Sequence, residues 1–282
     1  MNFLITGISS YIATYAAKKI LNKGHQVVGV SRTTPNLIHP AFKWIEYDLS
    51  KKLLKLDIPI DFIVHMAAVA RLDKTATDYF ESNILLTNNI KKLALMIHPK
   101  AVFYTSSMKV YGEISCKVAD EQMPIINPDL YGMSKYFGEK LLEQAMPAIS
   151  IRMPGTIADG SYGWIDSVYQ QLKKNKPVTL KNSSYNHVVH ANDIVSFILK
   201  TIKLNQFQTN QFNICASGLS TSLKVVQMMK DYLSSTSEIT WSDEDNFHII
   251  SNKKISKLFQ PMSVRKTIQL YLDEMKSSHQ IK

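Results

Sequence analysis

The first 30 residues set out a strand, a tight turn, a helix and a second strand. The apolar run 3–5 leads directly into turn residues. The spacing of Ile12 and Ala16 then predicts a helix. This helix is expected to end at Gly24, because glycine suits a helix C-terminus. The apolar run 26–30 predicts a second buried strand. A unit of this kind opens a parallel α/β sheet, and its turn is where such sheets bind a dinucleotide.

The turn after the first strand has small residues where a phosphate would come close to the backbone. Gly7, Ser10 and Ala13 fill the small positions of a Gly-x-x-Gly-x-x-Gly pattern, although two of the three glycines are replaced. Such a turn presents backbone N–H groups and a helix N-terminus to a pyrophosphate. The expected cofactor contacts in this segment are Gly7, Ser9, Ser10, Tyr11 and Ile12.

The residues after the second strand bear on which nicotinamide cofactor binds. A carboxylate there would hydrogen-bond the ribose of NAD, but the chain has Ser31 and Arg32, and we expect no carboxylate in reach. A hydroxyl and a guanidinium suit a 2′-phosphate, so NADP(H) is favoured over NAD(H). The alternative is that Arg32 is an ordinary surface arginine. Asp48 follows a third predicted strand and is expected beside the adenine.

Further apolar runs at 61–65, 101–105 and 148–152 predict three more strands, separated by helical segments. The alternation predicts an α/β fold with a doubly wound parallel sheet. His65 ends one of these strands and is expected to be structural, with backbone partners. Asn83 lies in a long helical segment over 75–97; it either holds a water or a backbone carbonyl near the site or is an exposed helix residue.

A tyrosine and a lysine one helical turn apart are the main candidates for chemistry. Tyr131 and Lys135 share a helix face, because residues four apart on a helix are neighbours. A nearby ammonium favours the phenolate, so we expect Lys135 to lower the pKa of Tyr131 and to fit it for proton exchange with a carbonyl. Ser106 and Ser107 follow the strand at 101–105, at the sheet edge where an open parallel sheet keeps its ligands.

Composition narrows the classes of partner. Hydrophobic residues make up 45% of the 282 residues and charged residues 20%, as in ordinary globular proteins. The net charge of +10 comes from scattered lysines, so we expect no nucleic-acid partner. No apolar run approaches the roughly 20 residues of a membrane span. With two cysteines and no recognised leader or metal motif, we expect a cytoplasmic protein without structural disulfides or a metal site.

Taken in order, these motifs resemble the extended short-chain dehydrogenase/reductases, a family of NAD(P)-dependent nucleotide-sugar epimerases, dehydratases and ketoreductases. The segments that carry the resemblance are Thr6-Gly7 to Ala13, Asp48-Leu49, His65 to Ala68, Asn83 with Thr87, 106–112, Tyr131 with Lys135, 151–155, 189–194 and 212–214. The resemblance implies a Rossmann domain at 1–157 and about 186–215, with a substrate lobe at 158–185 and 216–282. Members of this family are often dimers, so the resemblance also implies a possible homodimer.

The resemblance assigns roles to residues. Tyr131 exchanges a proton with the substrate oxygen, Ser107 hydrogen-bonds that oxygen, and Lys135 tunes the tyrosine and binds the nicotinamide ribose. The cofactor set it implies is Gly7, Ser9, Ser10, Tyr11, Ile12, Ser31, Arg32, Asp48, Leu49, Met66, Ala67, Ala68, Asn83, Tyr131, Lys135 and Pro154.

Departures from the family pattern concern the substrate. An Asn expected soon after Arg152 is missing, and Asn186-His187 stands where an Arg for the substrate pyrophosphate is usual; Lys181 is one candidate replacement. We expect an NADPH-dependent reductase of a 4-keto sugar nucleotide. Met108-Lys109 replaces the Asp-Glu pair of dehydratases and argues against dehydration. The alternatives are a nucleotide-sugar epimerase and a non-catalytic NADP(H)-binding sensor or scaffold.

Overall fold

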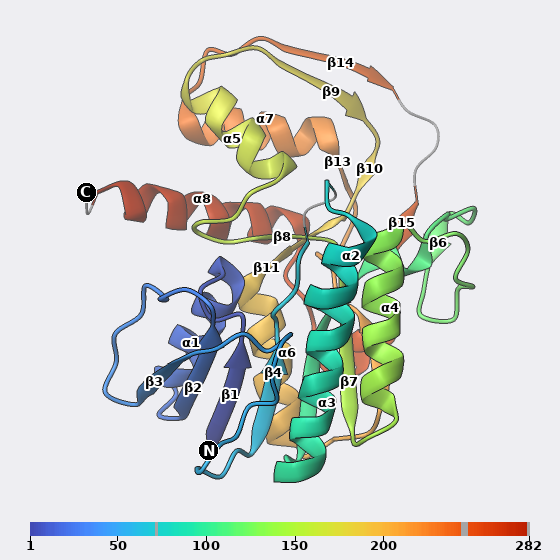
Figure 1. The fold of residues 1–282 in the computed structure, drawn as a ribbon. Helices are drawn as coiled ribbons and strands as arrows, with labels where there is room; N and C mark the ends of the chain where they lie inside the picture. Colours follow the sequence, from blue (N-terminus) through green and yellow to red (C-terminus); the bar gives the residue numbers. More distant parts are fainter. Residues whose placement is uncertain (71–72, 244–247, 281–282) are drawn as a thin grey trace.

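A computed structural model describes residues 1–70, 73–243 and 248–280, and a seven-stranded sheet lies at its centre (Figure 1). The strand order is β3-β2-β1-β4-β5-β7-β12, and every neighbouring pair is parallel. The bounds are Asn2–Thr6 for β1, Gln26–Ser31 for β2, Phe42–Glu46 for β3, Phe62–His65 for β4, Ala101–Ser107 for β5, Ala148–Met153 for β7 and Asn210–Asn213 for β12. This confirms the predicted α/β doubly wound sheet.

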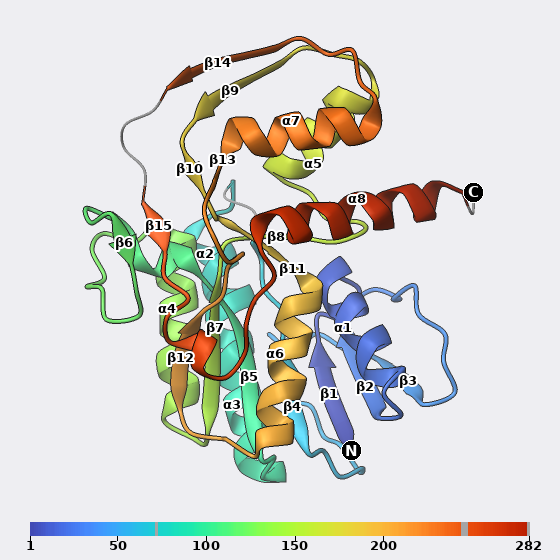
Figure 2. The ribbon, with the colours of Figure 1, turned by 180° about the vertical axis from the view of Figure 1, so that it is seen from behind.

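Helices cover both faces of the sheet (Figures 1 and 2). One face carries α1 (Tyr11–Leu21) and α6 (Ala191–Leu204). The other carries α4 (Leu130–Glu143) and a continuous helical segment made of α2 (Ala76–Tyr79), the π-helical η1 (Phe80–Leu85) and α3 (Leu86–Ile97). Buried apolar side chains of the strands form a separate core with each helical layer, since successive strand residues point to opposite faces.

Apart from η3, which joins the core between the sheet, α1 and α6, the remaining elements lie above the carboxyl ends of the strands, toward which the strand arrows point in Figure 1. They have their own core, built largely from the helices α5, α7 and α8. The helical elements are η2 (Met108–Tyr111), α5 (Trp164–Lys173), α7 (Ser222–Leu233), η3 (Ile255–Lys257) and α8 (Val264–Gln280). The strands, which form four two-stranded sheets, are β6 (Val118–Ala119), β8 (Gly155–Ile157), β9 (Val178–Asn182), β10 (Ser184–Tyr185), β11 (Val188–His190), β13 (Ser220–Thr221), β14 (Ile239–Asp243) and β15 (Ile249–Ile250).

This topology gathers polar strand ends at one edge. The register aligns Thr6 of β1 with His65 of β4, and Ser107 of β5 with Met153 of β7. Because β1 is followed in space by β4 on one side and β2 on the other, the chain reverses its direction of winding there, which opens a crevice for a ligand. Within the described ranges, no helix is both long enough and apolar enough to cross a membrane.

Candidate active site

Three cavities follow one another along the carboxyl edge of the sheet, with volumes of about 110, 450 and 460 Å³. We call them the first, second and third cavities. Ala68 lines both the first and the second, and Tyr131 and Pro154 line both the second and the third. They therefore form one interrupted path, with Tyr131 at the boundary between its last two parts.

The first cavity brings together the ends of β2 and β3. Its lining includes Gly7, Ser31, Arg32, Asp48, Leu49, Ala67 and Ala68. Burial would raise the pKa of Asp48, but two hydrogen bonds from Ser50, and to a smaller extent the charge of the exposed Arg32, hold it below its usual value. The expectation that no carboxylate is in reach here holds only for the residues that directly follow β2: Asp48 is remote along the chain, but β3 carries it to the same cavity.

Ser31 is less available to a ligand than we expected. Its hydroxyl donates to the Thr33 carbonyl at 2.7 Å and accepts from the Trp44 indole N–H at 3.1 Å. A hydroxyl has one proton to donate, so Ser31 in this arrangement has none for a 2′-phosphate. Arg32 is the remaining donor of the predicted pair.

The second cavity receives the N-terminus of α1. Ser9, Ser10, Tyr11 and Ile12 line it, together with Met66, Ala68, Lys135 and Pro154 among others. Ser10 caps the helix by accepting from the Ala13 N–H. The serine that replaces a glycine of the pattern therefore stabilises the start of α1. Gly7 has a φ of +70°, and a Cβ there would lie 2.8 Å from the Ala67 Cα. Glycine is needed at this position for both reasons.

Below this turn a chain of hydrogen bonds fixes the protonation of His65. The Thr6 Oγ1 accepts from the backbone N–H groups of Met66 and Ala67, each at 3.1 Å, so its own proton goes to the His65 Nδ1 at 2.8 Å. On the other side, Thr87 donates to the Asn83 carbonyl and therefore accepts from the His65 Nε2–H at 2.9 Å. His65 is neutral and structural, with hydroxyl partners in place of the expected backbone ones.

Asn83 is 1% exposed, which excludes the exposed-helix interpretation. Its side chain binds both backbone groups of Val69, accepting from the N–H at 2.7 Å and donating to the carbonyl at 3.1 Å, and it also donates to the Ser134 Oγ at 2.8 Å. It thus holds the segment that follows β4 against α4. Val69 lines the first cavity, so Asn83 shapes that cavity from behind.

Tyr131, Lys135 and Ser107 meet where the second and third cavities join. Lys135 lines the second cavity and is 2% exposed, whereas Ser107 lines the third and hydrogen-bonds Tyr131. Asp129 caps α4 by accepting from the Gly132 N–H at 2.7 Å, which sets the start of the helix one turn before Lys135. The helix therefore presents the phenol to both cavities.

The electrostatics of this group differ from our expectation. Burial raises the pKa of Tyr131 to about 12, and the hydrogen bond with Ser107 opposes part of the rise. Burial also lowers the pKa of Lys135 to about 7, against the attraction of the Glu139 carboxylate. The prediction of a lowered tyrosine pKa is wrong for the protein alone, because desolvation of the phenol raises its pKa by more than the Ser107 hydrogen bond lowers it.

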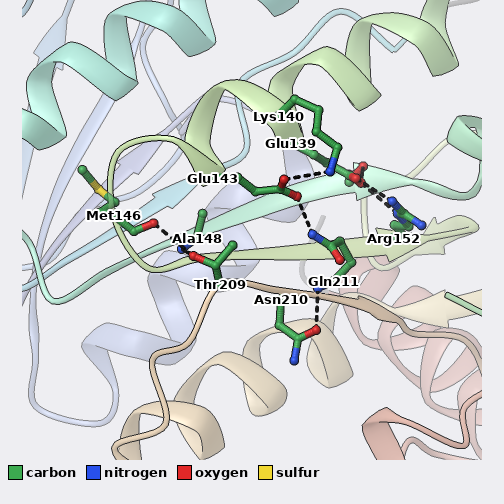
Figure 3. Close-up of polar contacts among 10 residues, drawn as sticks. Glu139, Lys140, Glu143, Met146, Ala148, Arg152, Thr209, Asn210 and Gln211 are labelled. Carbon is green, nitrogen blue, oxygen red and sulfur yellow. Dashed lines mark hydrogen bonds and ion pairs between the residues drawn. The ribbon is translucent and has the colours of Figure 1, made fainter. Parts of the chain in front are cut away.

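A buried ion pair behind the site escaped the sequence interpretation (Figure 3). Glu139 accepts from the Arg152 Nη2 at 2.7 Å and Nε at 3.0 Å, and from the Ser106 Oγ at 2.5 Å. Its side chain is fully buried and that of Arg152 is 6% exposed. A signal was present: Glu139 continues the i, i+4 stripe of Tyr131 and Lys135.

The third cavity holds further residues that the sequence did not single out. His187 and His248 both line it, with ring centroids 4.6 Å apart, and Lys109 joins them. Burial lowers the pKa of both histidines, that of His248 to about 4. The His187 Nε2 is buried and has no hydrogen-bond partner among the residues that the structure describes. Lys181, by contrast, lies on β9 and is absent from the linings of the three cavities.

An aromatic cavity of about 260 Å³ adjoins these. Tyr162, Trp164, Tyr185 and His187 are among its lining residues, and Tyr162 also lines the second cavity. Tyr162 and Trp164 are 66% and 39% exposed, so they are surface aromatics able to contact a ligand rather than core residues. Over the parts of the chain that the structure covers, no group of three or more His, Cys, Asp or Glu residues is placed to hold a metal ion.

Comparison with known proteins agrees with this geometry. The model of the "NAD dependent epimerase/dehydratase family" matches residues 3–215. The chain is 29% identical over 188 residues to a UDP-glucose 4-epimerase of Streptococcus mutans, covering 58% of this chain and 55% of that protein. It is 27% identical over 150 residues to a "Putative UDP-glucose 4-epimerase" of Methanocaldococcus jannaschii, covering 50% and 49%.

The fold is shared more widely. A UDP-glucuronic acid 4-epimerase from Bacillus cereus, solved in complex with NAD, superposes with a TM-score of 0.83 at 19% identity, covering 99% of this chain and 100% of that one. In sequence, the chain spans about half the length of the curated relatives it matches.

Proposed function

We propose that this chain, which belongs to the NAD-dependent epimerase/dehydratase family, is a nucleotide-sugar epimerase that inverts a hydroxyl-bearing carbon of the sugar. The observation that carries the proposal is the position of Tyr131, whose side chain lines both the cavity beside the α1 N-terminus and the cavity of Ser107. The similarity to UDP-glucose 4-epimerases favours a UDP-sugar and a 4-epimerase over a net reductase.

The residues of the second cavity fit a nicotinamide dinucleotide. They combine the helix N-terminus of α1 with the Lys135 side chain, and Gly7, where the backbone comes close to Ala67, lines the adjoining first cavity. Such a cofactor, when bound, supplies the acceptor and donor of a hydride. We infer that residues 1–157 and about 186–215 hold it, and that 158–185 and 216–282 hold the substrate.

The side chains perform the proton chemistry. Because its pKa is about 12, Tyr131 is a neutral phenol at pH 7, ready to donate to a carbonyl oxygen. To accept the proton of a sugar hydroxyl it needs stabilisation of the phenolate, which a charged Lys135 and the Ser107 hydrogen bond supply. An epimerase uses both directions in turn, and the keto sugar must present both of its faces; the third cavity, at about 460 Å³, provides the room.

A second candidate is an NADPH-dependent reductase of a keto sugar nucleotide. Arg32 favours it, because an exposed guanidinium at the end of β2 suits a 2′-phosphate. Asp48 weighs against it, since a carboxylate in the same cavity repels that phosphate and suits ribose hydroxyls.

The two candidates are separated by cofactor turnover. The purified protein is denatured and its released nucleotide identified, and the native protein is incubated with UDP-glucose or UDP-galactose without added cofactor, with products followed by NMR. Interconversion supports the epimerase. Stoichiometric oxidation of added NADPH with 4-keto sugar nucleotides, without interconversion, replaces it by the reductase.

Tyr131→Phe tests the assignment of the phenol in either case. We expect nearly unchanged cofactor affinity and a loss of turnover of 100-fold or more, on the order of a general acid–base contribution. Turnover close to that of the unmodified protein contradicts the role given to Tyr131. Loss of cofactor binding together with turnover identifies a structural effect instead. Cofactor binding without turnover in the unmodified protein points to the sensor or scaffold.

We also propose a homodimer through the layer of α3 and α4. Leu95 and Met96 of α3 and Leu130, Met133 and Phe137 of α4 are 42–53% exposed, a density of apolar side chains that a second copy would cover. Light scattering after size exclusion checks this. Phe137→Lys is expected to give a monomer, whereas Leu204→Lys, on the opposite face of the sheet, leaves the dimer intact. We place the protein in the cytoplasm, in keeping with free Cys116 and Cys215.

A further inference from the structure

The ammonium of Lys135 lies over an aromatic face. Its Nζ is 4.2 Å from the ring centroid of Tyr104, which stands on β5 and is 1% exposed. This is within the range in which a ring quadrupole attracts a cation, and the effect is strongest where water is excluded. Both partners are nearly fully buried, so the contact is a desolvated one.

Helix α4 is shaped to admit this ring. Gly138 lies three residues after Lys135, and a Cβ at Gly138 would be 2.3 Å from the Tyr104 Oη and 2.8 Å from its Cζ. Any larger residue would displace the ring. Gly138 thus forms a notch on the same helix that carries Tyr131 and Lys135, and Tyr104 fills it.

The other groups around Lys135 leave a role for the ring. Glu139, on the same helix, attracts the ammonium, but its carboxylate already accepts three hydrogen bonds from Ser106 and Arg152. His65 on β4 is kept neutral by burial and by the charge of Lys135. Tyr131 is a neutral phenol at pH 7. The face of the Tyr104 ring is therefore the remaining favourable surface for the cation.

We propose that Tyr104 is a positioning residue for Lys135: its ring, seated in the Gly138 notch, holds the ammonium at the second cavity and favours its charged form. The consequence for turnover rests on the proposed function, because only a charged Lys135 stabilises the Tyr131 phenolate. The effect on Lys135 itself is independent of any substrate.

The test titrates Lys135 directly. The full chain is labelled with ¹³C-lysine, the Lys135 Cε resonance is assigned by its loss in Lys135→Met, and its shift is followed with pH. Tyr104→Phe keeps the ring face, so the midpoint moves by less than about 0.3 pH units. Tyr104→Leu removes the face and lowers the midpoint by about one pH unit, within the range of a buried cation–π contact.

A nearly isosteric pair of variants keeps the test valid even if the leucine variant misfolds. Phenylalanine and 3,4,5-trifluorophenylalanine at position 104 have almost the same shape, but fluorination removes most of the negative charge of the ring face. The fluorinated protein is expected to titrate about half a pH unit or more below the Phe protein. Equal midpoints for this pair overturn the proposal, whatever the leucine variant does.

The pH dependence of turnover provides a second, separate measurement. In the proposed reaction, the pH profile of kcat shifts in parallel with the Lys135 midpoint across the series, which a merely structural defect would not produce. A shifted Lys135 midpoint with no turnover of nucleotide sugars in the unmodified protein refutes the proposed function and leaves the role of Tyr104 standing. Turnover of nucleotide sugars together with an unshifted Lys135 midpoint supports the proposed function and refutes the role of Tyr104.

Discussion

Replacement of Glu139 by Gln is expected to destabilise the protein far more than its position on a helix would suggest. The carboxylate is fully buried and accepts three hydrogen bonds, two of them from Arg152. A glutamine keeps the shape, but it leaves the guanidinium buried without a counter-charge and turns an N–H₂ group toward a donor. Removing one partner of a buried ion pair costs about 3–5 kcal/mol.

Glu143 provides a matched control on the same helix (Figure 3). It pairs with Lys140 at 2.7 Å and accepts from Gln211, but the side chains of Lys140 and Glu143 are 44% and 19% exposed. Because Lys140 is exposed and Glu143 only partly buried, the pair lies close to the surface range of about 0–1 kcal/mol, so Glu143→Gln is expected to cost no more than about 1 kcal/mol.

Urea denaturation followed by tryptophan fluorescence and circular dichroism compares the two variants. We expect the free energy of unfolding of Glu139→Gln to lie at least about 2 kcal/mol below that of Glu143→Gln. A second effect follows from charge: Glu139 raises the pKa of Lys135, so its neutralisation moves the titration of Lys135 to lower pH. Equal stability of the two variants refutes the view that the buried ion pair holds α4 to the sheet.

His65 makes stability depend on pH, because burial holds its pKa well below 6.5. Below about pH 6.5 the unfolded histidine binds a proton that the folded one does not, so the free energy of unfolding falls as the pH falls; urea midpoints at pH 7.5 and 5.5 measure this, and an undiminished slope in His65→Gln contradicts the assignment. Gly112→Ala is expected to cost more than Gly218→Ala in the same assay: both have positive φ, +67° and +72°, but only at Gly112 would a Cβ meet an atom, the Ile126 carbonyl oxygen at 1.9 Å. Asn83→Ala leaves both backbone groups of Val69 without their partner and is expected to cost about 1–3 kcal/mol and to weaken NAD(H) binding; unchanged affinity by fluorescence titration argues that the first cavity does not hold the adenosine.

Local pattern was enough to predict most of the sheet. The apolar runs at 3–5, 26–30 and 101–105 correspond to β1, β2 and β5, because a strand buried on both faces must be apolar throughout. The proximity of Tyr131 and Lys135 also followed from helix spacing, since α4 spans both residues. These predictions depend on neighbours within a few residues, and sequence contains that information directly.

Contacts between distant segments were beyond such reasoning. The pairing of β3 with β2 brings Asp48 into the same cavity as Arg32, and His187 meets His248 across 61 positions. For this reason the residues directly after β2 did not reveal that a carboxylate lines the same cavity. The substrate side of the site is composed almost entirely of such contacts, which is why the sequence identified missing residues there but not what stands in their place.

The amino-acid sequence by itself determined that a parallel α/β sheet forms and that a phenol and an ammonium share one helix face beyond its fifth strand. Only the tertiary structure decided how those groups behave. Burial raises the pKa of Tyr131 to about 12 and lowers that of Lys135 to about 7, and a ring from β5 lies under the ammonium. Spacing along a helix sets which side chains are neighbours, whereas the loss of water, which shifts both pKa values, exists only once sheet, helix and upper lobe have closed around them.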